Sequence, residues 1–98
     1  MGQKPIFYTV LGGFQILPPQ TAEGSTDNIQ TPFYVCRASK GYTTYWHNLI
    51  GIKISYDNFM QVAISAFNRG TSGYFTPKYR YGSLVNGVIS WDVWGDFA

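Results

Sequence analysis

One cysteine, one histidine and one aspartate of this chain are the residues that would suit nucleophilic catalysis. Cys36 would act as the nucleophile, His47 as its base and Asp57 as the carboxylate that orients the imidazole ring. Nothing in their spacing places the three together. Cys36 lies in the segment FYVCRA, where strand alternation predicts a buried, inert thiol, and we expect His47 to be a strand or turn residue with hydrogen-bonded ring nitrogens. One histidine and one cysteine also cannot close a metal site. We therefore predict no enzyme activity, no metal and no cofactor.

The carboxylates near the C-terminus do not predict an acid/base pair. Asp92 and Asp96 flank Trp94, and regular strand spacing would place both on the face opposite Trp91. Four residues apart on an extended chain, they are too distant for general acid/base chemistry on one bond. We interpret them as charges at a sheet edge, where they discourage the addition of further strands.

Aromatic and basic residues interleave in three short segments of the chain. They are Tyr42, Tyr45 and Trp46; Tyr79, Arg80 and Tyr81; and Trp91 and Trp94. Single-stranded nucleic acid would stack on such rings, but a net charge of only +2 does little to neutralise a phosphate backbone. Carbohydrate suits them better, since a sugar offers an apolar C–H face to an aromatic ring and hydroxyl groups to amides and carboxylates.

Six of these residues form the candidate site for a glycan or for an oligomer contact. They are Trp46, Tyr79, Arg80, Tyr81, Trp91 and Trp94. Roughly half of the aromatic residues must belong to the core, because each ring buries about 150–250 Å². The sequence does not decide which of the six lie in the core and which lie on the surface.

The composition predicts a single folded domain that is rich in β-structure. The chain has 98 residues, of which 45% are hydrophobic, 18% aromatic and 12% charged. An average soluble domain has about 25% charged residues, so disorder is excluded and a sheet is favoured. The basic residues are dispersed, which argues against a nucleic-acid partner. No apolar run approaches about eighteen residues, so we expect neither a signal peptide nor membrane insertion.

Short apolar segments separated by turn residues predict an all-β fold, a small antiparallel sandwich or barrel. The expected strands are residues 6–11, 14–17, 33–38, 43–55, 60–67, 74–81 and 88–94. The segment 43–55 would suit two strands hinged near Asn48 or Gly51, and Pro77 marks its strand as an edge or a bulge. Within 60–67, even-numbered side chains point one way and odd-numbered ones the other. Asn86-Gly87 predicts a hairpin that makes residues 79–81 and 91–94 cross-strand neighbours.

The chain divides into an N-terminal segment of residues 1–20, a polar loop or linker of residues 21–31 and a β-rich body of residues 32–98. The segment QTAEGSTDNIQT has the composition of a loop. The apolar segment before it ends at Pro18-Pro19. Two interpretations remain open for residues 1–20: an arm that adds a strand to the sheet of a partner, or the first strands of the same core.

The order of motifs in about the last fifty residues resembles the distal modules of bacteriophage tail fibres and the knob domains of tailocins. Those modules run as a strand of type x-Q-I/V-A, a short loop, an aromatic–Arg–aromatic strand and a closing W-x-x-W strand. The matching residues are Gln61-Val62-Ala63, Tyr79-Arg80-Tyr81, and Trp91 with Trp94. Fibre modules normally form the C-terminal end of a long protein. This chain starts at Met1 and has only a short arm before the matching region. The resemblance implies a homo-oligomeric virion surface protein, with a trimer favoured, anchored to other virion proteins through residues 1–20.

A second resemblance concerns the N-terminal half. Gly12-Gly13-Phe14 and FYVCRA are similar to the GGY and LYVGRA phrases of DM9-repeat lectins, although the Pro-Gly-Lys and Gly-Gly-Lys-Glu phrases of that family are absent. Both resemblances imply glycan-facing β-proteins. We therefore predict a non-enzymatic virion protein of the fibre or capsid-decoration type, with a host-surface glycan as candidate ligand. The alternative is a free lectin-like carbohydrate-binding domain, cytoplasmic or extracellular.

Overall fold

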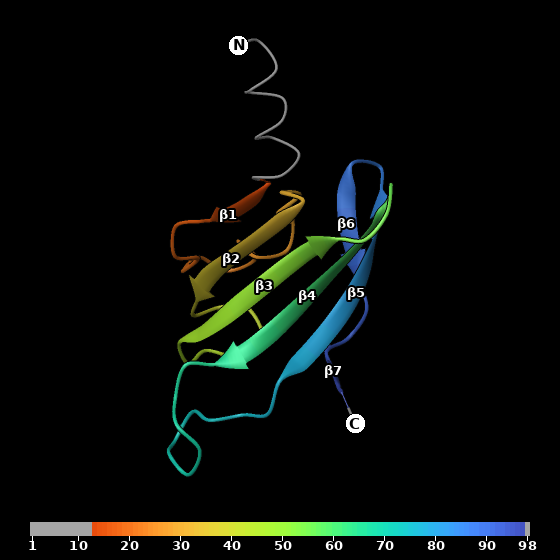
Figure 1. Cartoon of the computed structure of the whole chain (residues 1–98). Helices are drawn as coiled ribbons and strands as arrows, with labels where there is room; N and C mark the ends of the chain where they lie inside the picture. The colour runs from red at the N-terminus through yellow and green to blue at the C-terminus, as the bar shows by residue number, and fades with distance from the viewer. Residues whose placement is uncertain (1–12, 98) are drawn as a thin grey trace.

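The computed structural model describes residues 13–97, which form seven β-strands (Figure 1). The strands are β1 (Phe14–Ile16), β2 (Phe33–Ala38), β3 (His47–Lys53), β4 (Asn58–Ser65), β5 (Lys78–Val85), β6 (Val88–Trp91) and β7 (Gly95–Asp96). The predicted all-β class is confirmed, while the strand expected at residues 6–11 lies outside the described range. Among the described residues there is no helix long and apolar enough to cross a lipid bilayer.

The seven described strands belong to one sheet of order β1-β2-β3-β4-β5-β6, seen nearly face-on in Figure 1. β1 is parallel to β2, and the other pairings are antiparallel. Both β6 and β7 pair with β5, β6 along its C-terminal half and β7 at Lys78 and Tyr79. Asn86 and Gly87 have φ angles of 53° and 80°, as a two-residue type I′ turn requires, so the predicted hairpin is confirmed.

Three strand boundaries differ from the sequence prediction in ways that affect the site. The segment predicted at 43–55 gives the single strand β3, and residues 43–46 belong to the loop before it. β5 begins directly after Pro77, because proline has no N–H group to donate to the ladder. The closing segment leaves the sheet after Trp91 and returns at Gly95, which separates β6 from β7.

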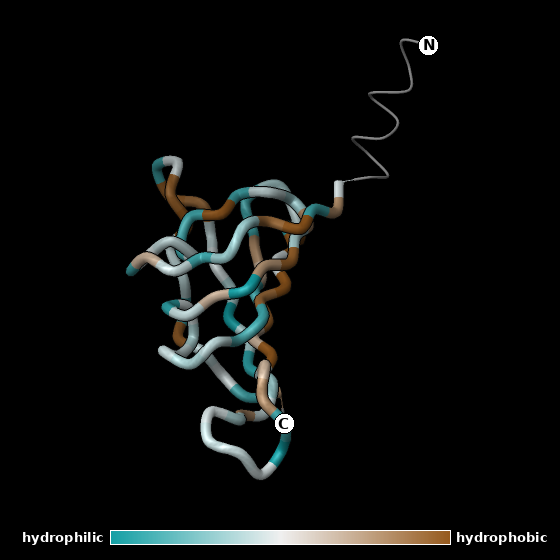
Figure 2. The backbone as a smooth tube through the Cα atoms, turned by 90° about the vertical axis from the view of Figure 1, so that its left-hand side faces the viewer, coloured by the Kyte–Doolittle hydropathy of each residue, from teal (hydrophilic) through white to brown (hydrophobic). Residues whose placement is uncertain are grey.

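Side-chain alternation gives the sheet an inner and an outer face. The inner face carries the buried cluster Tyr34, Cys36, Ala38, Leu49 and Ala63. Loops and the C-terminal segment cover this cluster with the partly buried side chains of Leu17, Ile29, Tyr42, Phe75 and Trp94. In the side view of Figure 2, hydrophobic residues (brown) are interspersed with polar ones along the chain.

The strand β4 shows that apolar character alone does not select the buried face. Its alternation is as predicted, but Gln61 and Ala63 are buried whereas Val62 is only partly buried and Ile64 is exposed. The outer face of the sheet is therefore apolar as well.

Residues between β1 and β2 cross over the inner face of the sheet. The backbone of Gln20 continues the parallel pairing, since its N–H donates to the Arg37 carbonyl at 2.7 Å and its carbonyl accepts from the Ser39 N–H at 3.1 Å. Further along, Thr26 is buried, and Gln30 Nε2 donates to the Gly87 carbonyl at 2.8 Å. Residues 21–31, predicted as a polar loop or linker, are a loop that packs on the sheet; we call them the crossover loop.

The Tyr34 ring packs directly against the backbone of Gly51, and this contact allows the packing of the inner face to be tested. Gly51 lies opposite Tyr34 in the β2–β3 ladder, and a Cβ atom at position 51 would overlap the Tyr34 ring. We predict that Gly51→Ala lowers the free energy of unfolding by about 1–3 kcal/mol, because a buried ring must shift. Gly95→Ala is the control, since a Cβ there meets no atom within 4 Å. Urea unfolding measures both variants, and equal stabilities would contradict the packing.

Candidate functional site

Three of the six predicted site residues lie together on the inner face. The guanidinium carbon of Arg80 is 4.3 Å from the centre of the Trp91 ring and 4.7 Å from that of Trp94. Two indole rings therefore hold one cation, an arrangement that is strongest when water is excluded. Burial lowers the pKa of Arg80, yet an arginine remains charged at neutral pH. These three residues have a clear role in packing the core.

A row of four residues across β2, β3, β4 and β5 extends from this cation. Tyr34, Gly51, Gln61 and Arg80 occupy successive positions of the ladder. Because Gly51 has no side chain, the Tyr34 ring lies across β3 and its hydroxyl reaches Gln61. Burial raises the pKa of Tyr34 to about 12, so the phenol keeps its proton at neutral pH.

Gln61 satisfies all its hydrogen-bonding groups except one acceptor lone pair, although it is fully buried. Its Nε2 donates to the Tyr34 hydroxyl at 2.7 Å and to the Thr26 carbonyl at 2.8 Å. Its Oε1 accepts from Arg80 Nε at 2.8 Å, and Arg80 Nη2 donates to Asp27 Oδ1 at 3.0 Å. The network joins the sheet to the crossover loop at two points: Gln61 binds the Thr26 carbonyl and Arg80 binds the Asp27 side chain.

The crossover loop is also attached to β6. Trp91 Nε1 donates to the Asp27 carbonyl at 2.7 Å, and the Ile89 N–H donates to Asn28 Oδ1 at 3.2 Å. The inner-face members of the predicted site are thus surrounded by loop backbone and buried side chains.

Tyr79 and Tyr81 lie on the outer face, because they alternate with Arg80 along β5. Their ring centres are 5.3 Å apart, and the Tyr79 ring is 5.0 Å from that of Phe97. Tyr81 is 47% exposed. These two rings form a surface pair separate from the inner-face cluster.

Trp46 lies apart from the other five predicted residues. It precedes β3 in the loop, and the Arg37 guanidinium is 5.6 Å from the centre of its ring. The six residues therefore divide among the inner face, the outer face and this loop, and they do not form one binding site.

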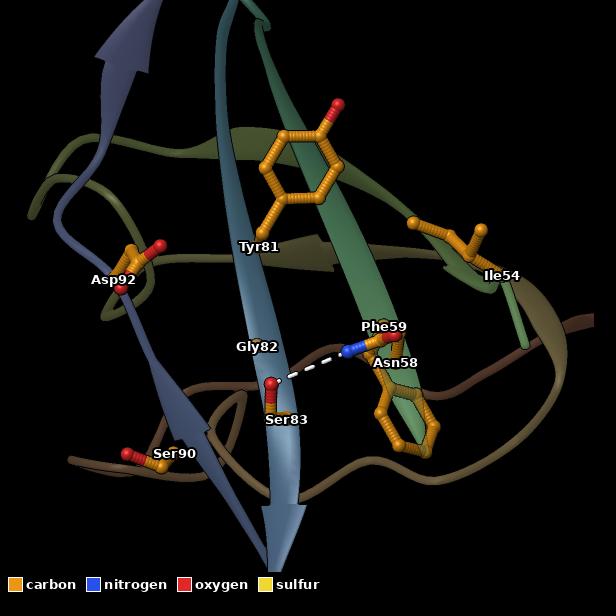
Figure 3. Close-up of a pocket in the computed structure, with 8 residues that line it drawn as sticks. All are labelled: Ile54, Asn58, Phe59, Tyr81, Gly82, Ser83, Ser90 and Asp92. Carbon is orange, nitrogen blue, oxygen red and sulfur yellow. Dashed lines mark hydrogen bonds between the residues drawn. The ribbon is translucent and has the colours of Figure 1, made fainter. Parts of the chain in front are cut away.

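A pocket of about 260 Å³ with both polar and apolar lining lies beside Tyr81, where β4, β5 and β6 are neighbours (Figure 3). We call it the Tyr81 pocket. Its lining includes Ile54, Asn58, Tyr81, Ser83, Ser90 and Asp92. Asn58 Nδ2 donates to Ser83 Oγ at 3.2 Å, the contact drawn in Figure 3, and Asn58 Oδ1 accepts from Ser55 Oγ at 3.2 Å. The pocket thus gathers an aromatic ring, an amide, hydroxyl groups and a carboxylate.

Sequence reasoning found Tyr81 but missed the polar residues around it. A signal for Ser83 and Ser90 was present, because they are equidistant from the Asn86-Gly87 turn and pair in the hairpin. Asn58 was not among the residues selected from the sequence. No local pattern brings it to Ser83, since that contact depends on the pairing of β4 with β5.

The predicted regular spacing of Asp92 and Asp96 does not hold, because the chain leaves the sheet between them. Asp92 lines the Tyr81 pocket. Asp96 pairs with Lys78 in the β5–β7 ladder and accepts a hydrogen bond from its ammonium group, which raises the pKa of Lys78.

The outer faces of β1 to β4 form a continuous apolar surface, the apolar outer face. Its side chains are Phe14 and Ile16, Phe33 and Val35, Ile50 and Ile52, and Met60, Val62 and Ile64. Ile16 is 79% exposed and Ile64 is 37% exposed. A shallow hollow of about 540 Å³ lies between them, lined also by Val35 and Ile50.

Cys36 and His47 do not form a catalytic pair. Burial raises the pKa of the Cys36 thiol to about 11, so it is not a thiolate at neutral pH. His47 Nε2 accepts from the Tyr42 N–H at 3.1 Å, and Nδ1 donates to the Tyr45 carbonyl at 2.7 Å. The buried thiol and the hydrogen-bonded ring are as predicted. Within residues 13–97, no group of three or more His, Cys, Asp and Glu side chains is placed to hold a metal ion.

No protein family, curated protein or solved structure matches the chain in comparisons with known proteins. The resemblances to tail-fibre modules and to DM9-repeat lectins therefore remain predictions from the sequence.

The Gln61 network can be tested by removing its central amide. We predict that Gln61→Leu lowers the free energy of unfolding by about 2–4 kcal/mol, because Arg80 Nε and the Thr26 carbonyl lose their partner inside the core. Gln15→Leu, at an exposed position of β1, is the matched control. Denaturant unfolding followed by tryptophan fluorescence measures both. A Gln61→Leu protein as stable as the control would show that the network does not hold the loop.

His47 predicts a pH dependence of stability. Burial lowers its pKa below the ordinary value of 6.5, so the unfolded chain binds a proton more readily than the folded one. The stability is full above that value and decreases as the pH falls below it. We expect Tm to fall between about pH 7.5 and about pH 5.5, and the His47→Gln variant to show a flatter profile in this range. Parallel profiles for the two proteins would exclude His47 as the cause.

Proposed function

We propose that this chain is a non-enzymatic structural protein of a virion, of the fibre or decoration type, that assembles as a homo-oligomer through its apolar outer face. The observation that carries the proposal is the difference in cover between the two faces. Loops and the C-terminal segment cover the inner face, whereas the described residues leave Ile16, Ile64 and the side chains between them exposed or half-buried.

The size of the apolar outer face suits an interface. Four strands about 4.8 Å apart give it a width of about 19 Å, and residues about 3.3 Å apart give it a length of about 16 Å on β4 and about 10 Å on β1, β2 and β3. Soluble monomers rarely expose contiguous apolar patches larger than a few hundred Å². A surface at this limit, with a hollow at its centre, favours burial against another protein.

A second copy of the chain is the occupant that the charges favour. Arg37 is the one charged residue among the outward-facing positions of β2, β3 and β4. Arg37 lines the hollow, so copies must meet with their Arg37 side chains offset from one another, and the other outward-facing positions of these strands bring no charge into the contact. The resemblance to tail-fibre modules favours a trimer. It also assigns contacts with other virion proteins to the N-terminal segment, of which Phe14–Ile16 already belongs to the sheet as β1.

Sedimentation velocity of the full chain tests the assembly. We expect the wild type to sediment as a homo-oligomer, and Ile16→Lys and Ile64→Lys to sediment as folded monomers, because each places a charge in the hollow. Tyr56→Lys is the control, since Tyr56 is 89% exposed in the turn between β3 and β4. A wild type that remains monomeric at high concentration, or Lys variants that assemble as well as the control, would overturn the proposal.

A further inference from the structure

We propose that the Tyr81 pocket is a binding site for a neutral hexose unit of a glycan. The proposal concerns a ligand and does not depend on assembly through the apolar outer face. It rests on the positions of side chains in two rows of the sheet.

The first row crosses three strands at one register. Asn58, Ser83 and Ser90 occupy matched positions of β4, β5 and β6, so their polar groups stand side by side on the outer face. The Asn58–Ser83 hydrogen bond at 3.2 Å fixes the orientation of the amide. This row offers hydroxyl and amide groups that can both donate and accept hydrogen bonds.

The second row lies two residues away, toward the end of β6. Tyr81 projects from β5, and the Asp92 N–H donates to the Tyr81 carbonyl at 2.8 Å, which places Asp92 beside it. Gly82 separates the rows along β5, and its missing side chain leaves room on the inner face, where a Cβ atom would meet Ile89 and Trp91. Two residues of a strand span about 6.6 Å, so one sugar ring that lies over the sheet can contact side chains of both rows.

The chemistry of the lining suits hydroxyl groups. A carboxylate accepts hydrogen bonds from two adjacent hydroxyls of one ring, and Asp92 is the carboxylate of the pocket. The ring of Tyr81, which is 47% exposed, presents an apolar surface to sugar C–H groups. In Figure 3, Asp92 lies to one side of Tyr81, and Ser83 and Ser90 lie below it on neighbouring strands.

The charge of the lining selects a neutral sugar. Asp92 is charged, and the described residues that line the pocket include no basic side chain. The nearest candidate cation, Arg80, is already engaged by Gln61 and Asp27. A uronic acid or a phosphate group would therefore face an uncompensated carboxylate.

A second cleft continues the pocket and favours a chain of sugars over a single one. It has a volume of about 510 Å³, shares Tyr81 and Asp92 with the pocket, and includes Tyr79 and Val93. It lies beside residues 92–94, which connect the end of β6 to the start of β7. A unit linked to the bound hexose would occupy this cleft.

Ligand-observed NMR with the full chain tests the site. The probes are the methyl glycosides of glucose, galactose and mannose, with glucuronic acid as the charged comparison. We expect at least one neutral glycoside to bind, and glucuronic acid to bind about tenfold more weakly or not at all. Tyr81→Ala and Asp92→Asn should each weaken binding by about tenfold, and Tyr81→Phe should retain it because the ring remains. Tyr45→Ala is the matched control, since Tyr45 is 51% exposed and lies before β3, outside the pocket.

Three results would overturn the proposal: no binding of any neutral glycoside by the folded wild type, binding that survives both Tyr81→Ala and Asp92→Asn, or preferential binding of glucuronic acid. Ile64→Lys separates this proposal from the assembly proposal, because Ile64 lies at the opposite end of β4 from Asn58. We expect this variant to be monomeric and still to bind the glycoside. An assembled wild type that binds no sugar would refute only the glycan site, and a monomeric wild type that binds sugar would refute only the assembly.

Discussion

The buried side-chain amide of Gln61 is the interaction on which the arrangement of this chain depends. It lies in a row with Tyr34, Gly51 and Arg80, and each member of the row makes the next one possible. Gly51 leaves space for the Tyr34 ring, the Tyr34 hydroxyl accepts from Gln61, and Gln61 accepts from Arg80. Such a network is favourable inside a protein only when its polar groups are paired, and the carbonyl of Thr26 supplies the remaining partner.

This polar row determines which face of the sheet is covered. The crossover loop packs on the inner face because Thr26 and Asp27 form hydrogen bonds with the side chains of Gln61, Arg80 and Trp91 there. The aliphatic side chains of the opposite face keep no such cover among the described residues. Among the described residues, the face with fewer polar partners is therefore the one available for a neighbouring molecule.

The same division separates the two proposed functions in space. The proposed assembly surface is the aliphatic part of the outer face around Ile50, whereas the proposed glycan site lies at its polar end, where serine and asparagine replace isoleucine and valine. Tyr81 stands between the two regions. Its partner in the ladder is Met60 on one side, and Asp92 contacts its backbone on the other.

Much of the local structure could be predicted because it depends on neighbours in sequence. The turn at Asn86-Gly87, the alternation in β4 and the burial of Cys36 follow from backbone preferences and the two-residue period of a strand. The candidate site could be predicted only in part. Tyr81 was among the six selected residues, but three of the other five form the cation cluster of the core, and Asn58, Ser83 and Ser90 were not selected.

The all-β class, the hairpin and the sets of side chains that share a face follow from the order of residues along the chain. Long-range contacts select which set is buried, because alternation shows which residues lie together and not which side of the sheet is covered. That choice depends on contacts between residues far apart in the chain, such as Asp27 with Arg80 and Asn28 with Ile89. For the same reason, the pairing of three strands, and no local motif, brings Asn58, Ser83 and Ser90 to the side of Tyr81.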